Sequence, residues 1–373
     1  MSGAPRILVV DDDPGMRRTL QRLLVPAYEV EAAGGAAAAL ERLAADDFAL
    51  ALVDVRLADG NGYALCQAIR QRRPETDVIL ITGSMSEPDE KLYRSLEEGA
   101  FYFLFKPFDR RVLLALVERC LELQHERAAK ERYAQTLAAD LERARRFQHS
   151  LLPRGPVAES GWRVEGRLQS CDALGGDLFL AHAGPDGLVC AVSDVVGHGV
   201  GAAMYAGMLR STLDAARRRC AEPEAMIGEL LDGIDFFEAA KYATMFYGLL
   251  LPEGRLRYVS AGHPPALWQS GAAVERLGAT GYFLSTAFRS EPAGAREIEL
   301  AAGDRLLIYT DGASEALDPD EQELGLEGLE EALRDSRKLP AAAALDALLG
   351  RIRTHCGGRP LADDVTLLLV ERC

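Results

Sequence analysis

The sequence lacks the features of several protein classes. None of its seven cysteines forms a Cys-x-x-Cys pair, and only six histidines occur among 373 residues. A disulfide framework and a cysteine–histidine zinc site are therefore not expected, and we expect a reducing, cytoplasmic environment. No apolar run is long enough to cross a bilayer, and the first residues lack the layout of a secretory signal peptide, so we expect neither a membrane span nor export.

The chain also lacks positive charge. Lysine and arginine number 42 against 57 aspartates and glutamates, which leaves a net charge of −15. Nucleic acids and anionic membranes attract basic surfaces, so the composition argues against both as partners. Divalent cations and positively charged protein faces suit an acidic chain better.

The residues that are present predict a folded protein of more than one domain. Hydrophobic residues make up 48% and charged residues 27% of the chain, and 373 residues exceed one ordinary core. We predict an N-terminal domain over residues 1–122, a helical linker over 109–152 and a C-terminal domain over 153–373.

The N-terminal segment alternates short apolar strands with helical stretches. Strand-like runs occupy residues 6–10, 49–55, 77–83 and 101–105, and residues 14–24 have a helical pattern. Such alternation predicts a doubly wound α/β domain with a parallel sheet covered on both faces. Ligands bind such sheets beyond the carboxyl ends of the strands.

Residues 109–152 contain neither glycine nor proline and lie between Pro107 and Pro153. We therefore predict one continuous helix. Leucine and alanine recur at heptad spacing along it, although Arg127 and Lys130 interrupt the pattern near its middle. Two interpretations stay open, a coiled coil that joins two copies of the chain and a single helix that packs on its own domains.

Beyond Pro153, short strands separated by turns predominate. The strand-like runs are 162–168, 188–192, 244–251, 256–260, 304–309 and 365–370, and helical stretches follow residues 201, 223, 324 and 340. This pattern predicts a sandwich of two sheets with helices outside it.

Polar side chains mark the strand ends of the N-terminal segment. Asp11 and Asp12 follow the first strand, Asp54 ends the next core strand, Thr82 ends the third and Lys106 the fourth. In a parallel sheet these ends meet at one edge. Three carboxylates there would hold a hard cation, while the hydroxyl and the ammonium group would bind a phosphoryl group placed on Asp54. Helix caps and surface charges are the alternative interpretation.

With these residues in place, the segment 5–122 resembles a response-regulator receiver domain, which has a five-stranded flavodoxin-like sheet. The resemblance implies that Asp54 is the phosphoacceptor, served by an upstream sensor histidine kinase or phosphotransfer protein. It also implies Mg²⁺ held by Asp12, Asp54 and the backbone carbonyl of Arg56, with Asp11 acting mainly through water.

The same resemblance implies a switch made of Thr82 and Phe103, together with Lys106. One departure is Ala58, where the family usually has proline. That difference concerns the rigidity of the loop more than its chemistry.

A second set of acids lies at strand ends in the C-terminal segment. Its members are Asp177, Asp194, Asp311 and Asp363, and three of them have glycine beside or near them. Oxygen ligands without a cysteine–histidine set favour Mg²⁺ or Mn²⁺, and two such ions can activate a shared water for attack on phosphorus. Asp-Gly turns explain single members of the set, but not all four.

The stretch 193–204, SDVVGHGVGAAM, also fits a dinucleotide-binding glycine pattern. That motif requires an acid at the end of a strand about twenty residues further on, and the sequence there is ARRRCAEPEA. The dinucleotide interpretation also leaves Asp177, Asp311 and Asp363 without a role.

Five motifs follow one another in the C-terminal segment: ALGGD, SDVVGHGVGAAM, YVSAGHPPALW, GDRLLIYTDGASEA and ADDVTLLLV. In this order they resemble the PPM family of metal-dependent serine/threonine phosphatases, in its bacterial sporulation and stress-response branch. The resemblance implies an αββα sandwich with two Mn²⁺ or Mg²⁺ ions. Asp194 would bridge both ions. Asp177 and the Val195 carbonyl would serve one ion, and Asp311 and Asp363 the other.

His198 and Asp364 are auxiliary candidates in this second set. Two departures from the family pattern are Leu180, where the family usually has a second acid, and GYFLS at 281–285, where it often has GxPLG.

The sequence thus predicts a phosphatase controlled by phosphorylation of Asp54. The branch resemblance implies a phosphorylated anti-sigma factor antagonist as substrate, and the linker suggests a homodimer. The alternative is an adaptor without activity that binds a sigma factor or its regulator, and Leu180 is its main support.

Overall fold

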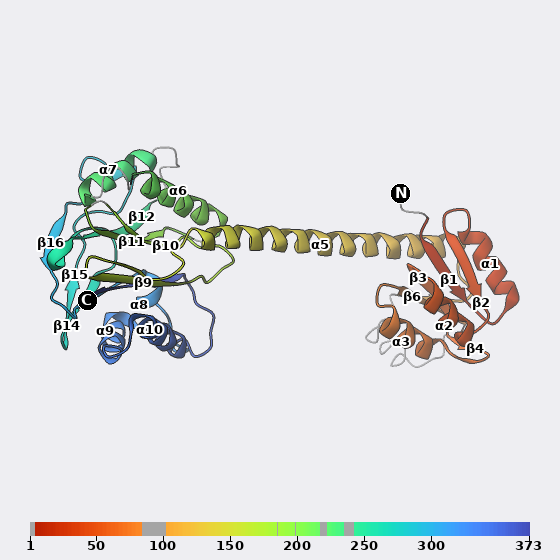
Figure 1. Ribbon diagram of the computed structural model, residues 1–373. Coiled ribbons are helices and arrows are strands. Elements are labelled where there is room, and N and C mark those ends of the chain that lie inside the picture. Colours follow the sequence, from red (N-terminus) through yellow and green to blue (C-terminus); the bar gives the residue numbers. More distant parts are fainter. Residues whose placement is uncertain (1–3, 84–101, 185, 198, 217–221, 235–241) are drawn as a thin grey trace. The chain divides into compact units, whose positions relative to one another are not determined.

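The computed structural model describes residues 4–83, 102–184, 186–197, 199–216, 222–234 and 242–373. The chain divides into two compact units, Met1–Thr136 and Leu137–Cys373, which are considered one at a time (Figure 1). Within the described residues, no helix combines the length and the apolar character that a membrane span requires.

The first unit is built on a five-stranded parallel sheet in the order β2-β1-β3-β6-β7. Its strands are β1 (Arg6–Val10), β2 (Glu29–Ala33), β3 (Leu50–Asp54), β6 (Asp77–Thr82) and β7 (Tyr102–Phe105). The predicted parallel α/β fold is confirmed. The strand order reverses between β1 and β3, and the crevice at such a point is where these sheets bind ligands.

Helices cover both faces of this sheet. They are α1 (Pro14–Leu24), α2 (Ala36–Ala45), α3 (Gly62–Arg72) and the start of α5 (Arg110–Ser150), and a small hairpin of β4 (Arg56–Leu57) and β5 (Gly60–Asn61) precedes α3. Side chains of α2 and α3 share one apolar core with one face of the sheet, and those of α1 and α5 share a second core with the other face.

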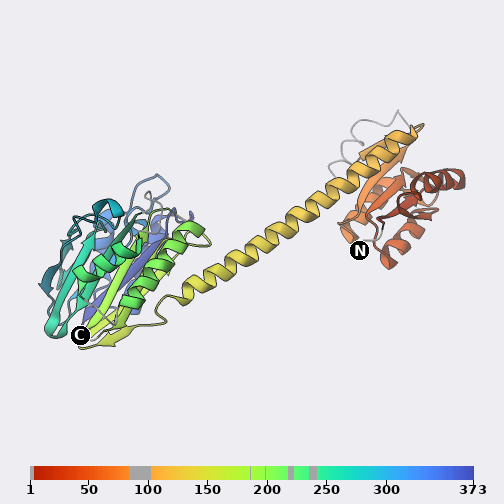
Figure 2. The same ribbon diagram turned by 90° about the horizontal axis from the view of Figure 1, so that it is seen from above.

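Helix α5 is continuous from Arg110 to Ser150, as the absence of glycine and proline predicts (Figure 2). Its first three turns bury Leu113, Val117 and Cys120 against the parallel sheet. Further along, the heptad residue Leu137 is 47% exposed in the single chain. The start of the helix therefore belongs to the core that it shares with α1, and its middle is largely exposed to solvent.

The second unit contains two antiparallel sheets, in the orders β10-β11-β12-β13-β16 and β15-β14-β17-β18-β9-β8. The strands are β8 (Val157–Glu159), β9 (Trp162–Gln169), β10 (Leu178–Ala183), β11 (Leu188–Val195), β12 (Ala243–Leu250), β13 (Arg255–Ala261), β14 (Ala266–Ser270), β15 (Ala273–Leu277), β16 (Arg296–Glu299), β17 (Arg305–Tyr309) and β18 (Val365–Arg372). The helices after α5 are α6 (Val200–Ala216), α7 (Pro223–Ile234), α8 (Asp311–Ser314), α9 (Gly325–Asp335) and α10 (Ala341–His355).

These elements form four layers. Helices α6 and α7 share an apolar core with the outer face of the first sheet, and α9 and α10 with the outer face of the second. A third core fills the space between the sheets. The predicted αββα sandwich is thereby confirmed (Figure 1).

Strand alternation decides which side chains reach the space between the sheets. In β11, Cys190 and Val192 belong to the core between the sheets, while Val189 and Ala191 face the helices. Because successive side chains point to opposite faces, Asp194 lies on the inner face as well.

We expect Leu113→Ala to destabilise the first unit, since Leu113 is fully buried between α5 and the sheet. Loss of a buried leucine costs about 2–5 kcal/mol. Hydrogen exchange of the β1 and β3 amides in the full chain measures this loss. Val112→Ala, at a neighbouring position that is 48% exposed, is the control and should change exchange little. Equal exchange in the two variants would show that α5 is no part of this core.

Candidate functional site

The acids predicted at the edge of the parallel sheet lie together in the first unit. Carboxylate oxygens of Asp11, Asp12 and Asp54 all lie within 4.8 Å of one another. Asp11 is 1% exposed and Asp54 8% exposed. Burial raises the pKa of Asp11, although its bonds to Lys106 and to the Asp13 backbone oppose that shift. Such a cluster suits a hard divalent cation.

Lys106 is bonded to two of these acids. Its Nζ donates to Asp11 Oδ2 at 2.9 Å and to Asp54 Oδ2 at 2.6 Å. Burial lowers the pKa of Lys106, but the bonds to the two carboxylates outweigh burial and raise it. The Lys106 backbone N–H donates to the Thr82 carbonyl at 2.7 Å, so the hydroxyl-bearing residue lies at the same sheet edge.

The other receiver residues named above surround this edge. The backbone N–H of Arg56 donates to Asp54 Oδ1 at 3.2 Å. Phe103 is buried, and its ring centroid lies 6.4 Å from that of Tyr63. Gly62 packs against the chain at Asp54, since a Cβ there would lie 2.3 Å from the Asp54 carbonyl oxygen. A larger residue would displace the loop that carries Arg56.

The four acids of the second unit come from four separate segments. Asp177 directly precedes β10 and Asp194 lies in β11. Asp311 begins α8 and follows β17 after Thr310, while Asp363 precedes β18 with Asp364 between them. Burial and the charges of Asp311 and Asp363 together raise the pKa of Asp194 to about 7, while Asp177 opposes the shift. Asp194 thus interacts with each of the other three predicted residues.

Asp177 is the most enclosed member of the set, with 3% of its surface exposed. Its Oδ2 accepts hydrogen bonds from Thr310 Oγ1 at 2.7 Å and Thr366 Oγ1 at 2.6 Å. Burial raises the pKa of Asp177 well above its usual range, and the charge of Asp194 adds to this, while the two threonines oppose it. Sequence analysis missed both threonines. The signal for Thr366 was a hydroxyl on an otherwise apolar strand.

Two glycines allow the acid-bearing segments to approach each other. A Cβ on Gly176 would lie 2.6 Å from the carbonyl oxygen of Val195, the predicted backbone ligand. A Cβ on Gly312 would lie 2.0 Å from the carbonyl oxygen of Asp364. Any side chain at either position would push apart segments that carry acids.

Of the two auxiliary candidates, Asp364 and His198, the structure describes Asp364. Asp364 is 3% exposed, and its Oδ1 accepts from the Cys171 backbone N–H at 2.9 Å, so it anchors the loop before Asp177. Asp363 is exposed, and its Oδ1 accepts from the Asp364 backbone N–H at 2.8 Å. His198 lies outside the described residues.

Leu180, the residue at the family's second acid position, does not share the inner face with Asp194. It is 1% exposed and belongs to the apolar core under α6 and α7. Because it alternates with Phe179, which faces the opposite sheet, its side chain points away from the acids.

The donor set of the second unit fits divalent metal ions. Across the described part of the chain, no lysine or arginine forms an ion pair with Asp177, Asp194 or Asp311. Carboxylates that repel one another in a partly buried place need a cation, and oxygen ligands select Mg²⁺ or Mn²⁺. Such ions would balance the negative charge that raises the pKa of Asp194.

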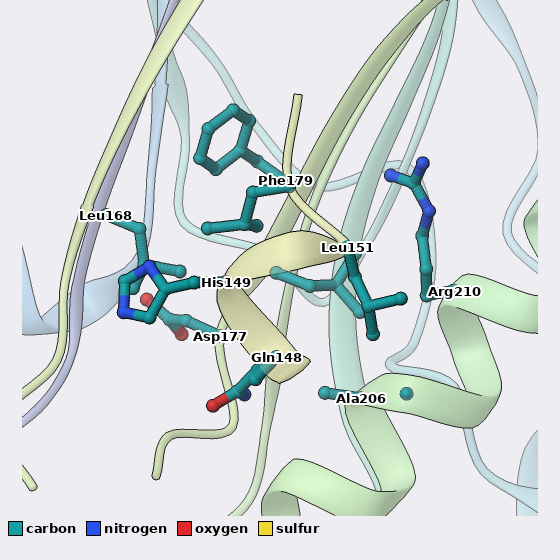
Figure 3. A pocket seen from close by; sticks show the side chains of 11 residues that line it. Gln148, His149, Leu151, Leu168, Asp177, Phe179, Ala206 and Arg210 are labelled. Carbon is teal, nitrogen blue, oxygen red and sulfur yellow. The ribbon is translucent and has the colours of Figure 1, made fainter. Parts of the chain in front are cut away.

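A pocket beside Asp177 is lined by the last turn of α5 (Figure 3). Gln148 of α5, Leu151 directly after α5, Phe179 of β10 and Arg210 of α6 are among the residues that line it. Gln148 Nε2 donates to the carbonyl oxygen of Gly175 at 2.7 Å, and the Gly175 N–H lies 3.4 Å from Gln148 Oε1. The end of α5 therefore contacts the loop that carries Asp177.

Comparison with known proteins assigns both segments to families. The family model described as Stage II sporulation protein E (SpoIIE) matches residues 184–373, slightly more than half of the chain. The model described as response regulator receiver domain matches residues 7–118. Protein IcfG from Synechocystis is 26% identical over 264 residues, which cover 62% of this chain and 41% of that protein. The chain spans less than half the length of the curated relatives that it matches.

Solved structures agree with the fold of the second unit. The SiaA-PP2C domain of Pseudomonas aeruginosa has a TM-score of 0.56 and 20% identity, and covers 65% of this chain and 98% of its own. The RsbU and RsbW domains of Rv1364c from Mycobacterium tuberculosis have a TM-score of 0.51 and 28% identity, and cover 59% and 61%. The chain therefore belongs to the SpoIIE family, and it carries a response regulator receiver domain ahead of its PP2C-like domain.

Proposed function

We propose that the chain is a metal-dependent protein serine/threonine phosphatase regulated by phosphorylation of Asp54. The observation that supports this proposal is that Asp194 is half-buried in the PP2C-like unit and interacts electrostatically with Asp177, Asp311 and Asp363. Family membership and the surrounding oxygen-only donor set support the same activity.

The proposed site holds two metal ions, Mn²⁺ or Mg²⁺. Asp194 would serve both ions, Asp177 and the Val195 carbonyl would hold one, and Asp311 and Asp363 would hold the other. Two such ions would supply a water of lowered pKa and neutralise charge on the phosphoryl oxygens. The exposed Asp363 and half-buried Asp194 leave the site open to the phosphorylated side chain of a protein.

The adaptor alternative has less support once the side chains are placed. Its main argument was Leu180, and this residue is buried in the core under α6 and α7 rather than beside Asp194. The absence of an acid at that position therefore leaves the four carboxylates in place. Hydrolysis of a phosphate ester separates the two proposals, because an adaptor releases no phosphate.

Asp194→Asn should abolish hydrolysis of para-nitrophenyl phosphate in Mn²⁺, since it removes one charge from the carboxylate shared by both ions. We expect the rate to fall by at least about 100-fold, the scale reported for loss of a main charge-stabilising group. Asp335→Asn, an exposed aspartate at the end of α9, is the matched control and should keep the wild-type rate.

Release of para-nitrophenol is measured by absorbance with and without a chelator. Equal rates for wild type and Asp194→Asn would refute the assignment of Asp194. No release from the wild-type chain, even with a phosphoprotein as substrate, would favour the adaptor.

For regulation, we propose that an upstream sensor histidine kinase, a phosphotransfer protein or a small phosphodonor phosphorylates Asp54. One Mg²⁺ held by Asp12, Asp54 and the Arg56 carbonyl would assist this transfer, with Asp11 acting mainly through water. Lys106 and Thr82, which lie at the same edge, would then bind the phosphoryl group. Thr82 and Phe103 would change position and alter the packing of α5.

Helix α5 is the proposed route to the phosphatase site. It is one continuous helix whose start is buried in the receiver core, and Gln148 in its last turn is bonded to Gly175, two residues before Asp177. A shift or rotation of the helix would move that loop. The exposed Leu137 and Tyr133 near its middle support pairing of two copies of α5, and hence a homodimer.

For the substrate, we propose a phosphorylated anti-sigma factor antagonist. The support is the resemblance of the motifs to the sporulation and stress-response branch and the SpoIIE family match. Removal of a phosphate takes away about two negative charges, which is enough to change which partner a protein binds.

Acetyl phosphate with Mg²⁺ should change the phosphatase rate of the wild-type chain by about threefold or more, a coupling within the usual range for linked sites. Asp54→Asn should show no such change, because it lacks the carboxylate that accepts the phosphoryl group. Asp13→Asn is the control and should respond like wild type, since Asp13 caps α1 through Gly15.

The rate is measured on a phosphoserine peptide before and after phosphorylation, and the phosphoprotein is followed by mass spectrometry. Gln148→Ala should weaken the response if α5 carries it. A wild-type chain that is phosphorylated on Asp54 without any change in rate would contradict the proposed regulation.

A further inference from the structure

The carboxylate of Asp177 is held by two hydroxyl groups from the opposite sheet. Thr310 Oγ1 donates to its Oδ2 at 2.7 Å and Thr366 Oγ1 to the same atom at 2.6 Å. Both threonines are 0% exposed. Asp177 directly precedes β10, whereas Thr310 directly follows β17 and Thr366 lies in β18, so these bonds join the two sheets of the sandwich.

Strand alternation places Thr366 on the inner face of β18. Leu368 and Val370 on the same strand belong to the core between the sheets, while Leu367 and Leu369 pack under the helices. A buried hydroxyl without a partner costs stability, and an apolar residue would fill such a position more cheaply. The bond to Asp177 gives the Thr366 hydroxyl its partner.

The Thr310 hydroxyl is bonded to the same carboxylate, that of Asp177. Its Oγ1 accepts from the Thr366 backbone N–H at 2.9 Å and donates to Asp177. Thr310 is also the N-cap residue of α8, where a threonine side chain normally accepts from the first backbone N–H groups of the helix. It makes no such cap bond here. The hydroxyl is used for Asp177 instead.

The two bonds restrict what Asp177 can offer a cation. A carboxylate oxygen has two lone-pair positions, and both positions of Oδ2 are taken by the threonines. Oδ1 is left for other contacts.

From this geometry we propose that Thr310 and Thr366 are positioning residues, which orient Asp177 so that it binds a metal ion through Oδ1 alone. The inference rests on the proposed function, because it assumes that Asp177 is a metal ligand. It adds two residues that act through Asp177. It also specifies that one oxygen of Asp177, Oδ1, is the ligand.

The test is Mn²⁺ binding by the full chain, followed by electron paramagnetic resonance of the free ion. Thr366→Val and Thr310→Val keep the size of the side chain and remove the hydroxyl, and we expect each to raise the Kd of the Asp177-bound ion about tenfold or more, as for other groups that support ligands. Thr366→Ser restores the hydroxyl and should recover most of the affinity.

Thr76→Val is the matched control for loss of a buried hydroxyl. Thr76 is 6% exposed and its Oγ1 donates to the Phe48 carbonyl at 2.8 Å, in the receiver unit. It should leave the Mn²⁺ affinity of the second unit unchanged. Circular dichroism checks that every variant is folded.

The outcomes separate this inference from the proposed function. A wild-type chain whose second unit binds no Mn²⁺ would overturn both. If the wild type binds Mn²⁺ and folded Thr366→Val and Thr310→Val bind it equally well, only the positioning role is overturned. If the valine variants do not fold, a crystal structure of the wild-type chain with Mn²⁺ decides, because ligation through both oxygens of Asp177, or through Oδ2, would contradict the inference.

Discussion

Repulsion among carboxylates is the interaction on which the second unit depends. Asp177, Asp194, Asp311 and Asp363 lie close enough for burial and mutual charge to raise the pKa of Asp194 to about 7. Such an arrangement is unfavourable for folding by itself, and a protein tolerates it only where a cation or a proton relieves it. The sandwich tolerates this electrostatic repulsion because burial of three apolar cores around the site stabilises the fold.

The two acidic clusters differ in which groups are bonded to their carboxylates. In the receiver unit, Lys106 supplies a positive charge within the chain, bonded to both Asp11 and Asp54. In the PP2C-like unit, the groups bonded to Asp177 are neutral threonine hydroxyls, which orient the carboxylate without balancing its charge. The charge of the first cluster is therefore partly neutralised by a side chain of the same unit, whereas the bonds to Asp177 leave its charge unbalanced.

Helix α5 takes part in both units through different kinds of contact. At its start, apolar side chains such as Leu113 and Val117 are buried against the sheet. At its end, Gln148 makes a polar contact with the backbone of Gly175. An apolar core resists small displacements, whereas a hydrogen bond to a loop responds to them. The start of α5 is therefore held more firmly than its end, where the contact is to the loop before Asp177.

The sequence by itself determined the parallel α/β unit, a second unit of sheets with helices outside, and the acids at strand ends, because apolar periodicity and strand-end carboxylates are local signals. The αββα arrangement followed from the resemblance of its motifs to the PPM family. The sequence did not show the edge strand β2, whose residues EVEAA lack a continuous apolar run. Only the tertiary structure decided that Thr310 and Thr366 meet Asp177 and that Gln148 reaches Gly175. The threonines lie 133 and 189 residues from their partner, and which side chains meet at such separations depends on strand register and sheet packing.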